Sequence, residues 1–259
     1  MRAASVAAFG GPDNIKIHND VQIPLITELN QVLIDVRAAG VNPVDTVILA
    51  GKFDLSKQLP YVPGIDGAGV VREIGSSVSH LQVGDRVWFY THDGAVAEVA
   101  VTTYAFPLPK GLSFTEGACL GLPYSVAYRA IFTKGHIKPG DRVLIHGASG
   151  GVGIASCQLS SFAGASLIVG TAGSQEGHDV VRRNGAHHVV NHREEGYIEN
   201  LKEIAPEGFD LIIELAGAVN LSTDINLLAK GGRVGIIGGK GAVSVQLGAL
   251  KNKEISVYG

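Results

Sequence analysis

The segment 148–153, Ala-Ser-Gly-Gly-Val-Gly, limits most strongly what this chain can fold into. It follows a short apolar run, Arg142–His146, and opens a helical stretch that extends to Ala163. A glycine-rich turn between a strand and a helix lets the backbone approach a pyrophosphate, whose charge is stabilised by the free N–H groups of the helix start. Gly153 would let the helix pack closely on the strand. The segment therefore predicts a dinucleotide-binding βαβ unit.

Extended and helical segments alternate through the rest of the chain. The expected strands are Ser166–Gly170, His188–Val190, Phe209–Leu215 and Arg233–Ile237, and the expected helices are Gln175–Asn184, Tyr197–Ile204 and Asn220–Leu228. This alternation predicts an α/β fold with a doubly wound parallel sheet, the Rossmann arrangement. Glu254–Tyr258 is expected to open a sixth strand. Because no helix follows that strand before Gly259, we expect a Rossmann domain that is C-terminally incomplete.

The N-terminal part of the chain contains short extended runs bounded by glycine, proline or aspartate. The expected strands are Val32–Val36, Gly67–Glu73, Arg86–Phe89 and Ala95–Val101. Strands at this spacing predict a compact, barrel-like β domain. A helical stretch is expected over Phe114–Phe132, with Ser113 and Glu116 as its capping box. We therefore expect a β-rich domain over residues 1–117 and a dinucleotide-binding domain over residues 118–259.

Charge and cysteine content exclude several classes of protein. The net charge is −3 with both signs interspersed, which argues against a broad nucleic-acid or anionic-membrane surface. Cys119 and Cys157 form no C-x-x-C pair, so neither a zinc ribbon nor a dithiol redox motif can be built. No apolar run approaches the roughly 20 residues of a membrane span, and the N-terminus lacks the apolar core of a signal peptide. A cytoplasmic protein with no membrane partner is expected.

The end of the second expected strand bears on the choice of cofactor. NAD-preferring sites place an acid there to hold the ribose 2′-hydroxyl. This chain has Gly-Thr-Ala-Gly-Ser at residues 170–174, and Glu176 lies further into the loop. Small residues leave room for a 2′-phosphate, so we expect NADPH rather than NADH. Positive or donor partners could come from His178, Arg182, Arg183 or His192, although Arg182 and Arg183 could equally form a solvated helix face.

Motifs in both halves of the chain resemble one family. The run His146–Gly153, with Asn-His-Arg-Glu at 191–194 and Gly-Gly-Arg-Val at 231–234, resembles the zeta-crystallin-type quinone oxidoreductases. These are zinc-free members of the medium-chain dehydrogenase/reductase superfamily. Gly-Val-Asn-Pro-Val-Asp at 40–45 and Pro-Gly-Ile-Asp-Gly-Ala-Gly at 63–69 match the same family in the N-terminal half. The resemblance covers the whole chain.

The resemblance implies a GroES-like catalytic domain and a cleft between the domains where NADPH reduces a quinone, often in a homodimer or homotetramer. It places the pyrophosphate against Ser149, Gly150, Gly151, Val152 and Gly153. Gly173, Ser174 and His192 would lie near the adenosine phosphate, and Asn220, Ile237, Gly238, Gly239 and Lys240 near ribose and nicotinamide. Asn42 would lie in the substrate cleft. The chain departs from the family at Val47, where a cofactor-contacting tyrosine is usual, and in having no contacts beyond the sixth strand. Both departures predict weaker cofactor binding, and we expect a chain extended beyond Gly259 to bind NADPH more tightly.

Metal and nucleophile chemistry are both disfavoured. The positions that match the catalytic zinc ligands of related alcohol dehydrogenases hold Asn42, Ile65 and Leu122, and the four-cysteine zinc loop is missing. No spacing among the nine histidines brings three ligands together, so no metal is expected. Ser149 resembles a hydrolase serine elbow but lies in the phosphate loop. Hydride transfer needs no enzymic nucleophile, and a proton could come from solvent, Tyr124 or Tyr128.

Three alternatives remain open. The same architecture supports reduction of a 2-enal or enone, which fold alone does not separate from quinone reduction. A non-catalytic NADPH-binding or RNA-binding protein is a further possibility that the resemblance carries, although the acidic balance argues against RNA. Asp45 and Asp66 are either polar groups of the cleft or loop hydrogen-bonding residues.

Overall fold

The computed structural model describes residues 1–53 and 57–259. Contacts between residues divide the chain into two compact units, Met1–Leu122 and Pro123–Gly259. The division lies a few residues beyond the boundary at 117/118 that the sequence indicates, because the turns after residue 117 still pack on the N-terminal unit. No helix among the described residues is long and apolar enough to span a membrane.

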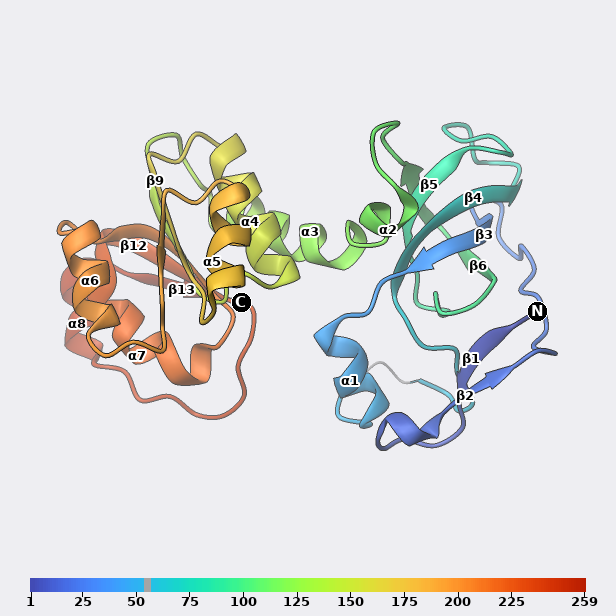
Figure 1. The fold of residues 1–259 in the computed structure, drawn as a ribbon, viewed down its shortest axis with the longest axis horizontal. Coiled ribbons are helices and arrows are strands. Elements are labelled where there is room, and N and C mark those ends of the chain that lie inside the picture. The colour runs from blue at the N-terminus through green and yellow to red at the C-terminus, as the bar shows by residue number, and fades with distance from the viewer. Residues whose placement is uncertain (54–56) are drawn as a thin grey trace. The chain divides into compact units, whose positions relative to one another are not determined.

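The N-terminal unit is built on a five-stranded antiparallel sheet that curls on itself (Figure 1). Its strands, in sheet order, are β6 (Val99–Thr102), β3 (Val32–Ala39), β4 (Asp66–Ile74), β5 (Arg86–Tyr90) and β7 (Tyr104–Pro107). A separate hairpin pairs β1 (Ala3–Val6) with β2 (Ile15–His18), and a short 3₁₀ turn, η1 (Pro12–Asn14), precedes β2. Ile34, Val87 and Phe89 are fully buried in the core that the curled sheet encloses. The β-rich N-terminal domain expected from the sequence is confirmed.

One expected strand is shorter than the sequence suggests. Of the run Ala95–Val101, only the last three residues belong to β6, which extends over Val99–Thr102. The preceding residues turn away from the sheet, because the N–H groups of Ala95 and Val96 both donate to the carbonyl of Pro63. Ala97 then forms an isolated bridge with Ala3. The apolar run is therefore divided between two pairing partners.

The helical segments near the middle of the chain also differ from expectation. Ser113 and Glu116 form the expected capping box at the start of α2, which extends only over Phe114–Gly117. Helix α3 (Gly121–Tyr128) follows after a turn and continues into a π-helical stretch, η2 (Arg129–Lys134). The single helix expected over Phe114–Phe132 is therefore wrong. A further short helix, α1 (Pro43–Leu49), lies in a region where no helix was expected.

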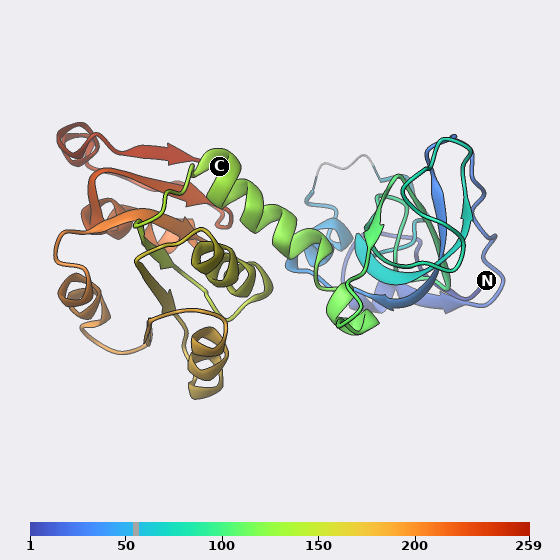
Figure 2. The ribbon, with the colours of Figure 1, turned by 90° about the horizontal axis from the view of Figure 1, so that it is seen from above.

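The C-terminal unit contains a six-stranded parallel sheet with helices on both faces (Figure 1 and Figure 2). In sheet order the strands are β10 (His188–Val190), β9 (Leu167–Thr171), β8 (Arg142–Ile145), β11 (Phe209–Glu214), β12 (Leu228–Ile236) and β13 (Ser256–Tyr258). The helices are α4 (Gly151–Phe162), α5 (Gln175–Arg183), α6 (Tyr197–Ile204), α7 (Gly217–Leu227) and α8 (Leu247–Lys253). This strand order is that of the doubly wound dinucleotide fold, which confirms the expected fold class.

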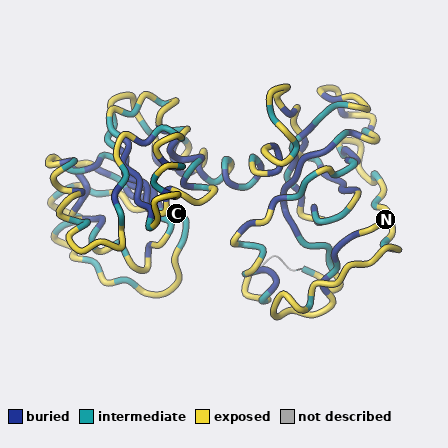
Figure 3. Tube along the Cα trace, viewed as in Figure 1, coloured by how far each residue is buried: buried dark blue, intermediate teal, exposed yellow. Residues whose placement is uncertain are grey.

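Alternation along the strands explains why both sheet faces are covered. In β8, Val143 and Ile145 pack into one buried cluster with Ala155 of α4, whereas Leu144 packs into another with Leu201 of α6. Successive side chains of a strand point to opposite faces, so a strand that is apolar throughout needs cover on both sides. Figure 3 shows these strands as the buried centre of the unit. The carboxyl ends of β8, β9, β11 and β12 therefore open onto one edge of the sheet, where ligands of such folds bind.

Candidate functional site

The glycine-rich turn joins the end of β8 to the start of α4. Gly150 is the N-cap residue of α4 and has no side chain to cap the helix itself. Ser149, Gly150 and Gly151 are exposed, whereas Gly153 is buried. A Cβ at Gly153 would lie 2.5 Å from the Cα of Ala148, so only glycine permits this approach of α4 to the turn. The N–H groups at the start of a helix of this kind form a site for a phosphate anion.

A second group of predicted residues lies at the tip of β9. Ser174 caps α5 by accepting a hydrogen bond from the N–H of Gly177 (3.2 Å). A Cβ at Gly173 would lie 2.6 Å from Nε of Arg193 and 3.0 Å from Nε2 of His192. Two basic side chains therefore lie directly against the tip of the strand. Burial, together with the charge of Arg193, lowers the pKa of His192.

From the sequence, Arg193 was not considered as a partner of a 2′-phosphate. It belongs to the segment 191–194, which drew attention only as part of a family motif. Arg182 and Arg183, which were considered, are exposed in the last turn of α5. A rise of about 1.5 Å per residue puts Arg182 roughly 12 Å along the helix from Ser174. His178 is nearer, and its Nε2 lies 3.0 Å from the carbonyl oxygen of Ala172.

The residues that follow β11 and β12 lie together. Asn220 is in the first turn of α7, and its Nδ2 lies 3.4 Å from Oε1 of Glu214. The N–H of Ile237 donates to the carbonyl of Glu214 (2.8 Å), and the N–H of Gly217 donates to the carbonyl of Gly238 (2.9 Å). Gly239 and Lys240 continue this segment and are exposed. These bonds place the two turns side by side at the carboxyl edge of the sheet.

In the N-terminal unit, Asn42 is held by a buried carboxylate. Its Nδ2 donates to Oδ1 of Asp66 (2.8 Å), and the N–H of Leu122 donates to Oδ2 of the same residue (2.8 Å). Burial raises the pKa of Asp66 even though both hydrogen bonds lower it. A Cβ at Gly40 would lie 2.1 Å from Oδ1 of Asp66, and one at Gly121 would lie 2.5 Å from its Cβ. Asp66 therefore acts as a hydrogen-bonding residue that joins three segments.

Other residues weighed from the sequence have clear surroundings. Asp45 accepts a hydrogen bond from the N–H of Asn42 (2.7 Å) within the capping box of α1. The hydroxyl of Tyr124 donates to Gln158, whereas Tyr128 is exposed and its ring contacts that of Phe132 in a tilted arrangement. Val47 lies within α1.

Sequence reasoning missed one cluster entirely. His146, Glu214 and Asp224 are up to 78 residues apart in the chain, yet one polar side-chain atom from each lies within 4.8 Å of the other two. His146 Nε2 lies 3.0 Å from Oδ1 of Asp224, which is a hydrogen-bonding distance. From the sequence, spacing was considered among the histidines alone, without the carboxylates that approach His146 from other elements. No spacing in the sequence predicts this cluster, because its members come from three separate parts of the fold.

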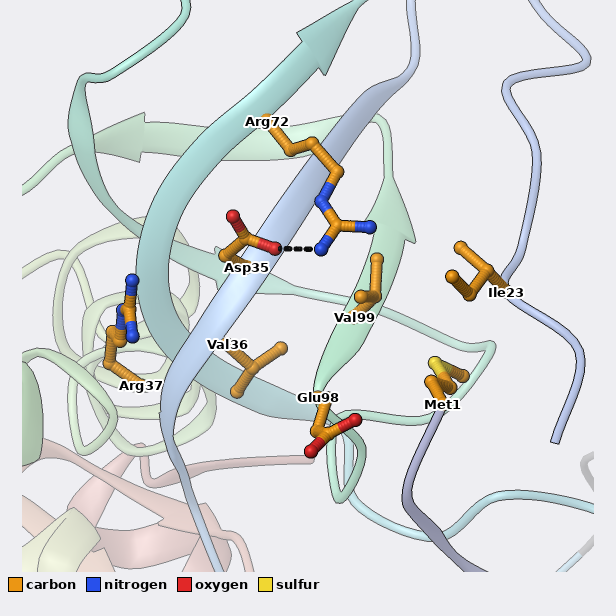
Figure 4. A pocket seen from close by; sticks show the side chains of 8 residues that line it. All are labelled: Met1, Ile23, Asp35, Val36, Arg37, Arg72, Glu98 and Val99. Atoms are coloured by element: carbon orange, nitrogen blue, oxygen red, sulfur yellow. Dashed lines mark ion pairs between the residues drawn. The ribbon is translucent and has the colours of Figure 1, made fainter. Parts of the chain in front are cut away.

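A surface hollow of about 410 Å³ lies elsewhere, on the N-terminal unit (Figure 4). Asp35 and Arg72 form an ion pair of 2.6 Å at its wall, and Glu98 accepts a hydrogen bond from the N–H of Arg2 (2.8 Å). Met1, Ile23 and Val99 complete much of the lining. None of the predicted site residues lies there, and the carboxylates that line the hollow already have partners.

Comparison with known proteins gives consistent matches over both units. Residues 28–115 match the family described as "Alcohol dehydrogenase GroES-like domain", and residues 151–259 match "Zinc-binding dehydrogenase". The chain is 47% identical to a quinone oxidoreductase of Lama guanicoe and 44% identical to one of Homo sapiens, in each case over all of this chain and 79% of the relative.

Solved structures agree in fold. An Escherichia coli quinone oxidoreductase complexed with NADPH superposes with a TM-score of 0.85 at 30% identity, covering 99% of this chain and 80% of that one. An NAD-dependent alcohol dehydrogenase superposes with a TM-score of 0.91 at 27% identity, covering all of this chain and 84% of that one.

Proposed function

This chain belongs to the quinone oxidoreductase family of the medium-chain dehydrogenases/reductases, and we propose that it reduces quinones with NADPH as the hydride source. The bound nicotinamide would supply the hydride, and the protein's own residues bind, orient and shield it from water. The relatives imply a small-molecule substrate. The matching positions Asn42, Ile65 and Leu122 supply no zinc ligand set, which supports a zinc-independent reaction.

The turn before α4 fits a dinucleotide pyrophosphate. Its exposed residues Ser149, Gly150 and Gly151 leave the backbone open, and the close packing of Gly153 holds the helix start at the turn. We propose that the N–H groups of residues 149–152 bind the pyrophosphate. Asn220 and the segment Ile237–Lys240, which lie together at the same sheet edge, would then contact the ribose and nicotinamide.

The preference for NADPH rests on the surroundings of Gly173. Residues 170–174, which end β9 and follow it, include no carboxylate that could hold a free 2′-hydroxyl. Arg193 and His192 instead lie against Gly173, where they could pair with a 2′-phosphate. We propose that Arg193 supplies most of the discrimination, because its guanidinium stays charged at every physiological pH. The position of Arg193 against Gly173 is the observation on which the assignment of NADPH depends.

Asn42 is the proposed substrate-side residue. Asp66 fixes the orientation of its amide through the 2.8 Å hydrogen bond, so that the remaining polar edge of the amide has a defined direction. An amide of fixed orientation can hydrogen-bond a carbonyl oxygen of the acceptor as negative charge develops on it. The homodimer or homotetramer that the resemblance implies stays a prediction, as does the absence of RNA binding.

A dinucleotide titration tests the proposal. Wild-type protein is expected to bind NADPH at least about tenfold more tightly than NADH, since a hydrogen bond to a charged group contributes about 1.5–3 kcal/mol. Arg193→Gln should remove most of this difference by weakening NADPH binding and leaving NADH binding unchanged. Arg182→Gln, at the exposed end of α5, is the matched control and should bind both as the wild type does. Equal dissociation constants of the wild type for the two dinucleotides would contradict the assignment.

A substrate panel tests the acceptor. With NADPH present, turnover of quinones is expected, and turnover of enones alone would replace quinone reduction by the alternative activity.

A further inference from the structure

Three ionisable side chains meet inside the parallel-sheet unit, beneath the proposed cofactor edge. His146 directly follows β8, Glu214 is the last residue of β11, and Asp224 lies in α7. Nε2 of His146 is 3.0 Å from Oδ1 of Asp224 and 3.8 Å from Oε2 of Glu214. The exposed fractions of the three side chains are 3%, 0% and 0%. Solvent therefore does not screen these groups from one another.

The cluster lacks a proton donor for two of its oxygens. Oε2 of Glu214 and Oδ2 of Asp224 are buried without a hydrogen-bond partner. A carboxyl oxygen of Glu214 and one of Asp224 lie within 4.8 Å of each other. Two carboxylates buried beside one imidazole cannot all stay ionised at low cost, because only one positive charge is available. One proton held by the carboxyl pair supplies the missing donor and makes the cluster neutral.

The pKa shifts agree with this proton count. Burial, reinforced by the hydrogen bond and charge of Asp224, raises the pKa of Glu214 to about 7 against the opposing charge of His146 and the hydrogen bond from Ala216. Burial alone would lower the pKa of His146, but its hydrogen bond to Asp224 and the charges of both carboxylates raise it. At pH values below about 7, the expected state is an imidazolium, one carboxylate and one carboxylic acid.

In the part of the chain that the structure describes, no further ion pair compensates the cluster. Among residues 1–53 and 57–259, the only ion pairs of Glu214 and Asp224 are those with His146. From β9 the cluster is faced by the Thr171 hydroxyl. From the segment after β10 it is faced by His192, whose pKa is lowered by burial and by nearby positive charge that includes His146. From α6 it is faced by Tyr197, whose pKa is raised by burial and by the charges of Asp224 and Glu214.

Hydrogen bonds connect the cluster to both turns of the proposed cofactor site. Oε1 of Glu214 accepts from the N–H of Ala216 and lies 3.4 Å from Nδ2 of Asn220, at the start of α7. On the other side, Nδ1 of His146 lies 3.4 Å from Oγ1 of Thr171, which accepts from the N–H of Gly147 (3.2 Å). The cluster thus joins the glycine-rich turn to the turn after β11.

We propose that His146, Glu214 and Asp224 form one proton-sharing positioning unit, which holds these two turns in the dinucleotide-binding conformation only while its shared proton is bound. This inference rests on the proposed function, since it concerns the same cofactor site. Loss of the shared proton leaves a net negative charge in the core. That charge repels the phosphates of the dinucleotide. The ionised Glu214 also needs more hydrogen-bond donors, and reorienting toward them would break its hydrogen bonds to Ala216 and Asn220 in the turn after β11. Dinucleotide binding is therefore accompanied by proton uptake.

The wild-type protein provides the first test. NADH dissociation constants are measured by calorimetry between about pH 6 and about pH 8.5, in two buffers of different ionisation enthalpy. NADH lacks the 2′-phosphate, so protons linked to a phosphate beside His192 do not contribute. One linked proton raises the dissociation constant by up to about tenfold per pH unit above the cluster's pKa, with net proton uptake on binding. A flat profile without proton uptake would overturn the proposal.

Two variants assign the proton to the cluster. Asp224→Asn leaves His146 and Glu214 as a pair that is neutral in either proton arrangement, so the slope with pH should disappear and binding at high pH should tighten. Glu214→Gln should flatten the profile in the same way and serves if Asp224→Asn does not fold. Asp179→Asn is the matched control, because Asp179 is exposed on α5. A merely structural role would weaken binding at every pH and leave the slope intact.

The remaining outcomes are also decisive. Retention of the wild-type slope in both cluster variants would overturn the proposal, as would a stoichiometric metal ion found in the purified protein by mass spectrometry. If folded wild-type protein binds neither NADH nor NADPH even at about pH 6, the proposed function itself fails. If it binds tightly and independently of pH, only the proton-sharing unit is refuted.

Discussion

Replacing Gly153 by alanine should move the start of α4 away from the glycine-rich turn. The added Cβ would lie 2.5 Å from the Cα of Ala148 and 2.5 Å from the carbonyl oxygen of Gly147. Both atoms are backbone, so no side chain can rotate aside, and the helix must shift by about 1 Å to restore ordinary contact. Overpacking of this kind costs about 1–3 kcal/mol, and the better helix propensity of alanine offsets at most about 1 kcal/mol.

The expected net loss is therefore about 1–2 kcal/mol of stability, or a decrease of about 2–8 °C in Tm. The displaced helix start should also lose up to about 2 kcal/mol of its attraction for the pyrophosphate, which is about thirtyfold in the NADPH dissociation constant. Thermal melts and a fluorescence titration measure the two effects.

Gly150→Ala is the control for stability, because its Cβ would meet nothing closer than the Gly147 oxygen at 3.5 Å and its φ of −81° suits alanine. That variant should unfold within about 0.5 kcal/mol of the wild type. If Gly153→Ala is equally stable, the steric argument for the close approach of α4 is refuted.

Two further predictions concern the ionisable groups of the chain. Burial raises the pKa of Asp210, but hydrogen bonds and charge from Arg142 outweigh it and lower the pKa. The stability that this carboxylate contributes is thus present above its unfolded pKa and is lost as pH falls through its folded pKa. The urea midpoints of wild type and Asp210→Asn should therefore differ at pH 6 and converge in strong acid. A difference that stays constant with pH would contradict this prediction. Cys157 is fully buried, and burial raises the pKa of its thiol to about 12, whereas Cys119 is exposed. A disulfide reagent should therefore titrate one thiol in the native protein and two in denaturant, and rapid reaction of both native thiols would show that Cys157 is accessible.

The sheet of the C-terminal unit was predictable because its signals are local. Each strand is an apolar run next to a turn, and the glycine-rich segment 148–153 defines the first crossover by its own composition. The sixth strand was equally visible in Glu254–Tyr258, of which Ser256–Tyr258 pairs with β12. Helix α1 was missed because it spans only Pro43–Leu49, too short for a helical period to show above its β-rich surroundings.

The candidate site was predictable only in part. Ser149 and Gly173 each lie just after the end of a strand, and the ends of these strands can be predicted from the local pattern of apolar residues and turn residues. Arg193 and the partners of His146 depend on which distant elements come together, and on which side chains of a strand face which way. A shift of one residue in the pairing register of β11 would place Glu214 on the opposite face of the sheet, so the sequence alone left its contact with Asp224 undetermined.

The surroundings of Asp66 have a consequence for how this sequence can drift over generations. Gly40 and Gly121 leave no room for a side chain beside Asp66, and that carboxylate in turn holds Asn42 and the N–H of Leu122. A smaller residue at 66 would not by itself make room, because an added Cβ at 121 would still lie 2.5 Å from the Cβ of residue 66, and one at 40 would still lie 2.8 Å from the carbonyl oxygen of Ala118. No single substitution therefore makes a second one easier, and we expect glycine to persist at 40 and 121 even in descendants that have lost the carboxylate at 66.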